Sequence, residues 1–235
     1  MLGAMCGRFT LRHSEAEVSE AFDAMSPGLG LAPRFNIAPT QDVAVVRPAS
    51  GGGGGRELAR VRWGLLPGWV DDPGDFPTLI NARAESARTK PSFRGAFATR
   101  RCLVPADGFY EWKKTGSGKQ PWFVRREGDR LFAFAGLWER WEREERRVDS
   151  ATILTTAPGE LLAELHDRMP VILPGESWSA WLDPELPAGE AEELLDAHEP
   201  ADLESYPVDR HVNSPRNDDP ACVEPAGDRR GSGSG

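Results

Sequence analysis

Five short segments with the composition of β-strands follow one another between residues 101 and 156, and their spacing constrains the fold more than any other feature of the sequence. They are Arg101–Pro105, Gly108–Lys113, Pro121–Arg126, Leu131–Trp138 and Ser150–Thr156. Turn signals such as Thr115-Gly116-Ser117-Gly118 separate them, and the charged stretch 139–147 is expected to be another connection. Short strands at this spacing indicate an antiparallel barrel or sandwich rather than a parallel α/β sheet.

The rest of the chain adds loops, further strands and short helices. A capping box at residues 14–17 predicts a helix with Val18, Ala21, Phe22 and Met25 on one face. Strands are expected at 6–11, 43–47 and 58–64, a Pro/Gly-rich loop at 27–41, and short helices at 158–166, 177–181 and 190–197. Because there is neither an internal repeat nor a second core, we expect one α+β domain over residues 6–222, preceded by a leader (1–5) and followed by a disordered tail (223–235).

Composition excludes several classes of protein. No apolar run of the 235 residues approaches the ~20 needed to span a membrane, and no export signal is recognisable, so a soluble cytoplasmic protein is expected. Three unpaired cysteines and four scattered histidines argue against a disulfide framework and a metal site, and no cofactor is implied.

Net charge argues against a general nucleic-acid binder, because the chain carries a formal charge of −9. The acid is concentrated in residues 176–204, however. A basic stretch leaves a local, salt-sensitive cationic groove possible; its members are Arg83, Arg88, Lys90, Arg94, Arg100 and Arg101.

Cys6 is the first candidate for chemistry, because it follows Met5 and becomes N-terminal if residues 1–5 are absent. A terminal cysteine carries a thiol and an α-amine on adjacent carbons, with ordinary pKa values of about 8.5 and 7.7–8.0. Such a pair converts an aldehyde first into an imine and then into a five-membered thiazolidine. The alternative is that Cys6 is a small buried residue in a strand.

Four polar residues are further candidates, each with a structural alternative. Glu111 lies between aromatic residues in a strand, where partial burial would raise its pKa for acid–base chemistry, unless it faces solvent beside a lysine. His166 follows a helix, where it would move protons or simply cap the helix end. Asn81 and Arg83 are placed in a loop and would bind a ligand or serve the turn.

Eight segments, in order, resemble the SRAP (SOS response-associated peptidase) family of abasic-site processing proteins, and together they extend from Met5 to about Cys222. The matching segments are Met5–Phe9, Arg34–Pro39, Trp63–Trp69, Ile80–Glu85, Gly108–Trp112, Thr155–Ala157, His166–Pro170 and Val212–Asn213. The resemblance implies an SRAP fold, binding of single-stranded DNA that contains abasic sites, and covalent capture of the opened sugar by Cys6 as a thiazolidine crosslink.

The resemblance also implies roles for individual residues. Asn81 would hydrogen-bond the linked sugar, Glu111 would relay protons, and His166 would assist imine formation, strand-cleaving lyase chemistry or reversal. Residues expected to contact DNA are Arg8, Asn36, Pro39, Trp69, Arg83, Thr156, Arg168 and Asn213. Trp69 and Pro39 would stack on bases or wedge beside the lesion, or else simply pack in the protein. A monomer is expected, associated with the nucleoid when it acts on DNA.

The beginning of the chain departs from the family pattern, which starts Met-Cys. Either Met5 is the initiator and an aminopeptidase removes it, or the Met5–Cys6 bond is cleaved autocatalytically; Met5 is the favoured initiator.

Two other functions remain open. One is a cysteine or N-terminal-nucleophile peptidase for external amides, with Cys6 as the nucleophile and His166 or Glu111 as the base. The other is a non-catalytic single-strand-binding module.

Overall fold

Five strands close into a barrel in the computed structural model, which describes residues 7–50, 54–116, 118–196 and 199–227. Around the barrel they run β11 (Arg146–Thr156), β10 (Phe132–Arg143), β7 (Arg101–Ala106), β4 (Asp42–Pro48) and β5 (Arg56–Trp63). Neighbours pair antiparallel, except that β5 returns to β11 in parallel, Arg62 facing Ser150. Short strands extend this sheet; they are β2 (Ala24–Met25), β6 (Asn81–Arg83), β12 (Met169–Pro170) and β13 (Ile172–Leu173).

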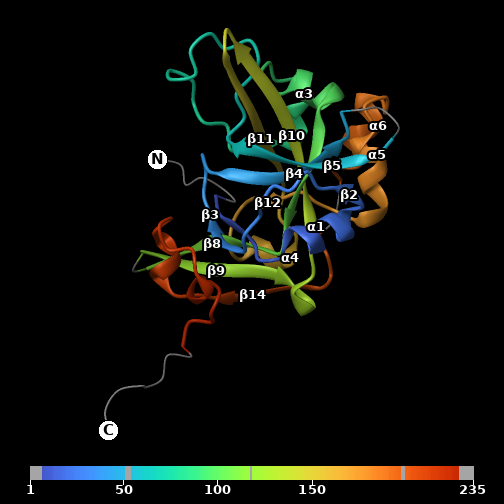
Figure 1. Cartoon of the computed structure of the whole chain (residues 1–235). Helices are drawn as coiled ribbons and strands as arrows, with labels where there is room; N and C mark the ends of the chain where they lie inside the picture. Colours follow the sequence, from blue (N-terminus) through green and yellow to red (C-terminus); the bar gives the residue numbers. More distant parts are fainter. Residues whose placement is uncertain (1–6, 51–53, 117, 197–198, 228–235) are drawn as a thin grey trace.

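A second, fully antiparallel sheet lies beside the barrel (Figure 1). Its order is β14 (Leu203–Pro207), β9 (Gly118–Arg126), β8 (Gly108–Thr115), β1 (Phe9–Leu11) and β3 (Arg34–Ile37). Aromatic contacts join the two sheets, because the Phe9 ring lies 5.1 Å from that of Trp63 and 5.9 Å from that of Phe134. Each fully buried ring of this kind contributes about 1.5–3 kcal/mol, so the first strand is firmly held against the barrel.

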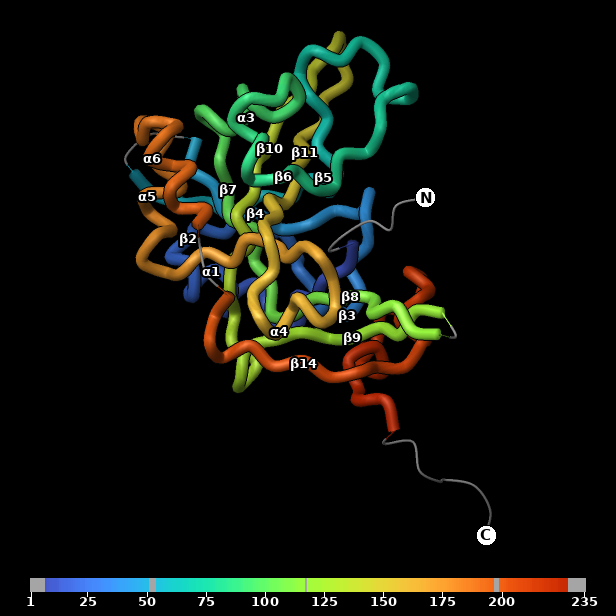
Figure 2. Tube along the Cα trace, turned by 180° about the vertical axis from the view of Figure 1, so that it is seen from behind, coloured from blue at the N-terminus to red at the C-terminus, as the bar shows by residue number. Residues whose placement is uncertain are grey.

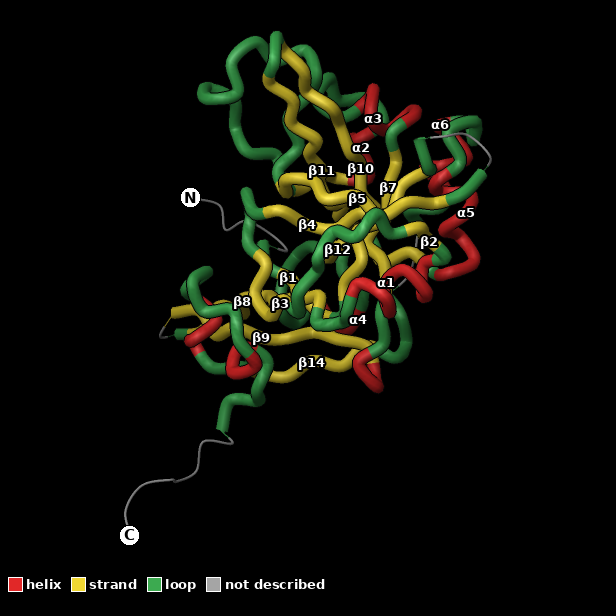
Figure 3. The backbone as a smooth tube through the Cα atoms, in the orientation of Figure 1, coloured by secondary structure: helices red, strands yellow, loops and turns green. Residues whose placement is uncertain are grey.

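Helices are short and lie at the periphery (Figure 3). They are α1 (Glu15–Phe22), α2 (Ala84–Ala87), α3 (Arg94–Thr99), α4 (Glu160–Ala163), α5 (Trp178–Leu182) and α6 (Ala188–Glu193). Single 3₁₀ turns occur at η1 (Glu127–Asp129), η2 (Gly175–Ser177), η3 (Arg210–Asn213) and η4 (Pro220–Cys222). Helix α5 packs on β7, and α4 lies near β14 (Figure 2). Within the described ranges we find no helix with the length and apolar character needed to cross a membrane.

The α+β class, the antiparallel barrel and the short peripheral helices predicted from the sequence are confirmed. The capping box at Ser14 is confirmed as well. The Ser14 hydroxyl accepts a hydrogen bond from the backbone N–H of Glu17, and the Glu17 carboxylate accepts one from the backbone N–H of Ser14. The predicted apolar face of this helix is partly wrong. Val18 and Phe22 are buried, but Ala21 is exposed, and Met25 lies beyond the helix with 67% of its surface exposed.

Two connections expected from the sequence are strands instead. The charged stretch 139–147 is not a long turn, because β10 and β11 continue through it as a hairpin, with Glu139 opposite Ser150 and Arg143 opposite Arg146. The predicted loop at 27–41 contains β3, which pairs with β1. Its residues obtain backbone partners from a strand far away in the sequence, and local composition does not reveal such a partner.

Candidate functional site

The described chain begins at Gly7, at the edge of a tightly bonded part of the second sheet. Phe9 faces Phe109 across β1 and β8, and the N–H of Tyr110 donates to the carbonyl oxygen of Arg8 at 3.0 Å. Gly108 is required here, because a Cβ on it would collide with the ring of Phe123 on β9. Cys6 and the Met5–Cys6 bond lie outside the described residues; what the structure gives is the platform that follows them.

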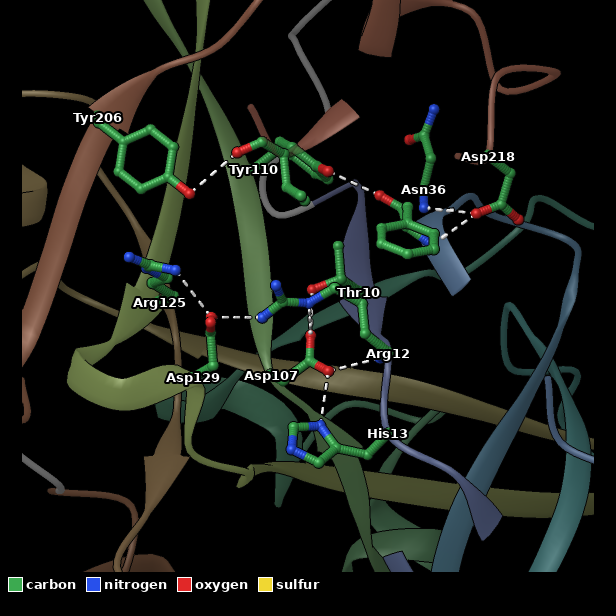
Figure 4. A network of polar contacts seen from close by, with 12 residues as sticks. Thr10, Arg12, His13, Asn36, Asp107, Tyr110, Arg125, Asp129, Tyr206 and Asp218 are labelled. Carbon is green, nitrogen blue, oxygen red and sulfur yellow. Dashed lines mark hydrogen bonds and ion pairs between the residues drawn. The ribbon is translucent and has the colours of Figure 1, made fainter. Parts of the chain in front are cut away.

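A buried carboxylate fixes β1 on this platform (Figure 4). Asp107, which lies between β7 and β8, accepts hydrogen bonds from the Thr10 hydroxyl and the Arg12 N–H, both at 2.5 Å. The Arg12 side chain bonds it at 3.0 Å, and Nδ1 of His13 lies 2.9 Å from it. Asp107 is fully buried, so these contacts compensate the cost of removing its charge from water.

Asn36 and Arg8 connect the second sheet to the C-terminal segment. The Asn36 amide nitrogen donates to three backbone carbonyl oxygens in residues 212–217, at 2.7–3.1 Å. Its side-chain oxygen accepts from Arg8 at 2.8 Å, and Arg8 also donates to the Val212 and Asn213 carbonyl oxygens. Burial lowers the pKa of Arg8, opposed by Tyr110 and Cys222. Asn36 is fully buried, so the structure places it inside the protein, as a link between chain segments.

Glu111 is buried in β8, with 2% of its surface exposed. The alternative that it faces solvent beside a lysine is therefore wrong. It stands opposite Trp122 of β9 and between Tyr110 and Trp112 in sequence. Because side chains alternate along a strand, Glu111 shares a face with Lys113. Its position is suited to a carboxylate that handles protons out of contact with bulk water.

A cleft of about 630 Å³ opens beside this strand. Its cations include Arg83 of β6, Lys113 and Lys114 of β8, and Lys119 of β9. Two carboxylates, Glu164 and Asp167, also line it, and Lys113 pairs with Glu164 at 3.6 Å. The β8–β9 hairpin places Lys114 directly opposite Lys119. Like charges facing each other across two strands destabilise a hairpin, so the pair is better suited to a bound anion than to the free protein.

His166 lines the opposite part of the same cleft, after α4. Its Nδ1 lies 3.2 Å from the N–H of Arg168 and 2.8 Å from the carboxylate of Asp167. The neutral ring accepts from the first group, and the protonated ring donates to the second, so both charge states have a partner. These contacts hold the ring at the wall of the cleft.

Arg168 also lines the cleft, but its guanidinium is already engaged. It binds both carboxylate oxygens of Glu85, at 2.5 and 2.8 Å, and the carbonyl oxygen of Thr155 at 2.5 Å. Hydrogen bonding to Arg168 lowers the pKa of Glu85, which keeps the pair ionised. These contacts fasten β11 to α2 and orient the wall of the cleft that carries His166.

Asn81 and Arg83 lie in the short strand β6 rather than in a loop, which corrects the expectation from the sequence. Asn81 faces Ile153 and Arg83 faces Thr155 in a parallel pairing with β11. The indole of Trp63 donates to the Ile80 carbonyl oxygen at 2.9 Å, just before this strand. Asn81 is half-buried and Arg83 exposed, so only Arg83 is fully open to solvent.

The remaining predicted DNA contacts are spread over the surface. Trp69 is 57% exposed, and its ring packs edge-on against that of Phe76. Trp69 also lines a second hollow of about 680 Å³, together with Arg94 and Arg100. Pro39 and Thr156 are half-buried, at the turn after β3 and at the end of β11. Asn213 is exposed, and its side-chain oxygen accepts from the Trp112 indole at 2.8 Å.

Three of the six residues in the basic stretch expected to form a groove are engaged within the protein. Arg101 is 2% exposed and donates to backbone carbonyl oxygens, among them that of Trp181 at 2.7 Å. Arg88 is paired with Glu192 and Arg100 with Glu139. Sequence reasoning instead missed Lys114 and Lys119. The turn signal at 115–118 could have identified them, because a hairpin there brings the flanking lysines together.

Comparison with known proteins adds the family. The model of the SOS response associated peptidase (SRAP) family matches residues 5–215. The abasic site processing protein YoqW of Bacillus subtilis is 40% identical over 225 residues, which cover 94% of this chain and 99% of that protein. Abasic site processing protein YedK of Escherichia coli is 32% identical over 234 residues, covering 94% and 100%.

A solved structure extends the likeness to the backbone. The crystal structure of a protein from Bacteroides thetaiotaomicron matches with a TM-score of 0.85 at 25% identity, covering 94% of this chain and all of that one.

Abasic site processing protein HMCES of Gallus gallus is 37% identical over 197 residues, which cover 72% of this chain and 58% of that protein. The sequence resemblance is thereby confirmed, and this chain belongs to the SRAP family.

Proposed function

We propose that this protein processes abasic sites in DNA, and that it binds them in single strands as a monomer. Relatives that match almost all of this chain carry the name abasic site processing protein. The observation that carries the proposal is the cationic cleft beside the buried Glu111, at the end of the sheet from which the N-terminal strand emerges. We place its action in the cytoplasm, at the nucleoid.

The proposed chemistry begins with Cys6 as the N-terminal residue. Its neutral α-amine attacks the aldehyde carbon of the opened sugar, and loss of one water gives an imine. The thiol then adds to the imine carbon, its proton passes to the nitrogen, and a thiazolidine ring closes. The positive charge of Arg8 two residues later favours the neutral amine by repulsion between like charges. Where the ring closes slowly, the imine withdraws electrons and promotes β-elimination, which breaks the sugar–phosphate bond.

Three residues are assigned to this chemistry. Glu111, shielded from water, takes protons from and returns them to the amine and the sugar during ring opening, closure and reversal. His166, which has a partner in each charge state, assists the loss of water that forms the imine. Asn81, held by β11, hydrogen-bonds the linked sugar.

The single strand of DNA is held mainly by charge. Arg83, Lys114 and Lys119 are exposed cations that line one cleft and are available to phosphates on either side of the lesion. Arg168 acts here through its contact with Glu85, by shaping the wall of the cleft. Pro39 and Trp69 are assigned to bases flanking the lesion, and Thr156 and Asn213 to the edges of the binding surface.

Maturation completes the proposal. Cys6 acts only once it is the N-terminal residue. Either translation begins at Met5 and an aminopeptidase removes that methionine, or the protein itself cleaves the Met5–Cys6 bond. The peptidase activity is therefore assigned to the protein's own N-terminus.

The test mixes the protein with a single-stranded oligonucleotide that carries one abasic site, followed by a denaturing gel. We expect a heat-stable covalent band with the wild type and none with Cys6→Ala, whereas an oligonucleotide without the lesion gives no band. Absence of the wild-type band would overturn the proposal and leave a non-catalytic binding module. Cleavage of unrelated reporter peptides without DNA, together with no crosslink, would favour the peptidase for external amides.

A further inference from the structure

Three potential metal ligands come together at the C-terminal end of the domain, in a group to which the proposed function assigns no role. They are His211 of η3, Asp219 just before η4, and Cys222 at its end. Their nearest ligand atoms all lie within 4.8 Å of one another, and this is the one such group in the part of the chain that the structure describes. The histidines are scattered in the sequence, which is why the sequence predicted no metal site.

The geometry and the ligand types fit zinc. Zinc binds imidazole nitrogen and carboxylate oxygen at about 2.0–2.2 Å and thiolate sulfur at about 2.3 Å, in tetrahedral arrangement. Two ligands of one tetrahedral ion are then about 3.3–3.6 Å apart. Nε2 of His211 lies 3.0 Å from the Asp219 carboxylate, so a small relaxation admits the ion between them. Three protein ligands leave the fourth position to water.

Burial distinguishes this group from a chance gathering of surface residues. Cys222 is fully buried in a small apolar cluster with Tyr110, Phe123, Val208 and Val212, whereas His211 and Asp219 are half-buried. Burial raises the pKa of the Cys222 thiol above its usual value, which Asp219 and Asp218 reinforce although a backbone hydrogen bond opposes it. A thiol of this kind is inert by itself, and a cation would replace its proton.

Zinc binding changes the protonation of His211 and of Cys222. In the metal-free protein, Nδ1 of His211 is 3.1 Å from the side-chain nitrogen of Asn217, which donates to it, so the ring proton is on Nε2 and points at Asp219. Zinc at Nε2 requires this proton to move to Nδ1 and the Asn217 amide to turn its oxygen toward it, which gives up the 2.7 Å hydrogen bond from the amide nitrogen to the His211 carbonyl oxygen. Cys222 releases its thiol proton to solvent. Binding thus frees one proton, and coordination replaces both the His211–Asp219 contact and the 3.4 Å hydrogen bond from the Cys222 thiol to the Asn217 carbonyl oxygen.

We propose that His211, Asp219 and Cys222 bind one zinc ion, which fastens the C-terminal segment to the sheet that carries the first strand. The segment between these ligands is already bonded to the second sheet, because the carbonyl oxygens of Val212 and Asn217 accept from Asn36 of β3. The ion's task in this proposal is to hold the segment, with water as its fourth ligand, and the binding site is independent of the crosslinking chemistry.

The test uses the full chain with Cys6→Ala as background, so that the N-terminal thiol contributes no ligand. Zinc chloride is titrated calorimetrically, and cobalt(II) serves as a spectroscopic probe, because a cobalt–thiolate bond gives a charge-transfer absorption. We expect one zinc per chain, a zinc-dependent rise in melting temperature, and the thiolate band with cobalt. Adding Cys222→Ser should remove the band and weaken zinc binding at least tenfold.

Cys102→Ser is the matched control, because Cys102 is also fully buried but lies in the barrel strand β7. It should leave zinc affinity and the cobalt band unchanged. Asp219→Asn retains the oxygen that accepts from Ala221 and should weaken binding without unfolding η4, which circular dichroism checks. Titrations without heat or band, or equal affinity in the Cys222→Ser and Cys102→Ser proteins, would overturn the proposal.

Discussion

The side chain of Arg8 donates a 2.8 Å hydrogen bond to the side-chain oxygen of Asn36, and the Asn36 amide nitrogen continues the connection to the carbonyl oxygens of Val212, Ser214 and Asn217. One buried amide thus joins the beginning and the end of the domain. Both residues were expected from the sequence resemblance to contact DNA. Asn36 is fully buried and Arg8 is half-buried, and their contacts hold the two ends of the domain together.

Replacing Asn36 should therefore cost stability. Asn36→Ala leaves three buried or partly buried carbonyl oxygens without their donor, and we expect the free energy of unfolding to fall by about 2–4 kcal/mol in urea denaturation. Asn213→Ala is the control, because Asn213 is exposed and loses one side-chain contact with Trp112. Equal, small losses in the two variants would show that Asn36 does not carry the link.

Glu111→Gln tests the proton relay. The amide retains the size of the buried carboxylate but cannot exchange protons, so we expect crosslink formation to slow by about 100-fold while DNA binding is retained. Quenched time courses on abasic DNA give the rate, and fluorescence anisotropy gives the affinity. Glu160→Gln, an exposed residue of α4 that does not line the cleft, should match the wild type. Unchanged crosslinking and reversal rates in Glu111→Gln would remove Glu111 from the mechanism.

The cationic cleft predicts a change in salt dependence. Arg83→Ala and Lys114→Ala should each weaken single-strand binding and reduce the slope of log affinity against log salt by about 1, as expected for the loss of one phosphate contact. The control Arg130→Ala removes a cation that lies outside this cleft and pairs with Asp202. A slope that Arg83→Ala leaves at the wild-type value would exclude Arg83 from the phosphate contacts.

Trp69 offers an exposed ring for stacking. Trp69→Ala should weaken binding of single-stranded DNA by about 1–3 kcal/mol, the usual contribution of one stacked base, and should leave the salt slope unchanged. Met25→Ala is a comparable loss of exposed apolar surface elsewhere. If both variants bind like the wild type, the hollow around Trp69 is not part of the DNA surface.

Asp149 should make the stability of the fold depend on pH. Its pKa is lowered because hydrogen bonds and charge from Arg140 and Arg147 outweigh burial, the largest single effect, which raises it. A carboxyl group with a lowered pKa stabilises the fold fully above its unfolded pKa, about 3.9, and loses this contribution as the pH falls further. Wild type should therefore melt above Asp149→Asn at neutral pH, and the difference should shrink in acid.

The control for this pH effect is Asp71→Asn, because Asp71 is fully exposed. Its melting temperature should follow that of the wild type throughout the series. A wild-type advantage over Asp149→Asn that persists unchanged into strong acid would contradict the ionic origin of the effect.

Much of the fold could be predicted from local signals. The strands of the barrel and the helix after Ser14 carry patterns that their own residues determine. What could not be predicted depends on distant partners. Residues 81–83 form a strand only because β11 lies beside them, and the hairpin at 139–147 is extended because Trp141 buries its ring and donates to the Val70 carbonyl oxygen at 2.6 Å.

The candidate site shows the same division. The family motifs located Glu111, Arg83 and His166, and the structure brings Arg83 and His166 to one cleft with Glu111 buried in the adjoining strand. The motifs did not show that Asn36 is turned inward, since its three acceptors lie about 180 residues away along the chain. Burial and pairing across the sheet decide such roles, and neither is written in a short motif.

The proposed function requires an N-terminal Cys6 to capture the damaged sugar. Intact mass spectrometry of the species crosslinked to an abasic oligonucleotide measures this in one step. We expect the mass of the chain beginning at Cys6 plus the oligonucleotide minus one water, with the DNA-bearing peptide containing Cys6. A fully active crosslinked species that still carries residues 1–5, or one joined through another residue, would contradict it.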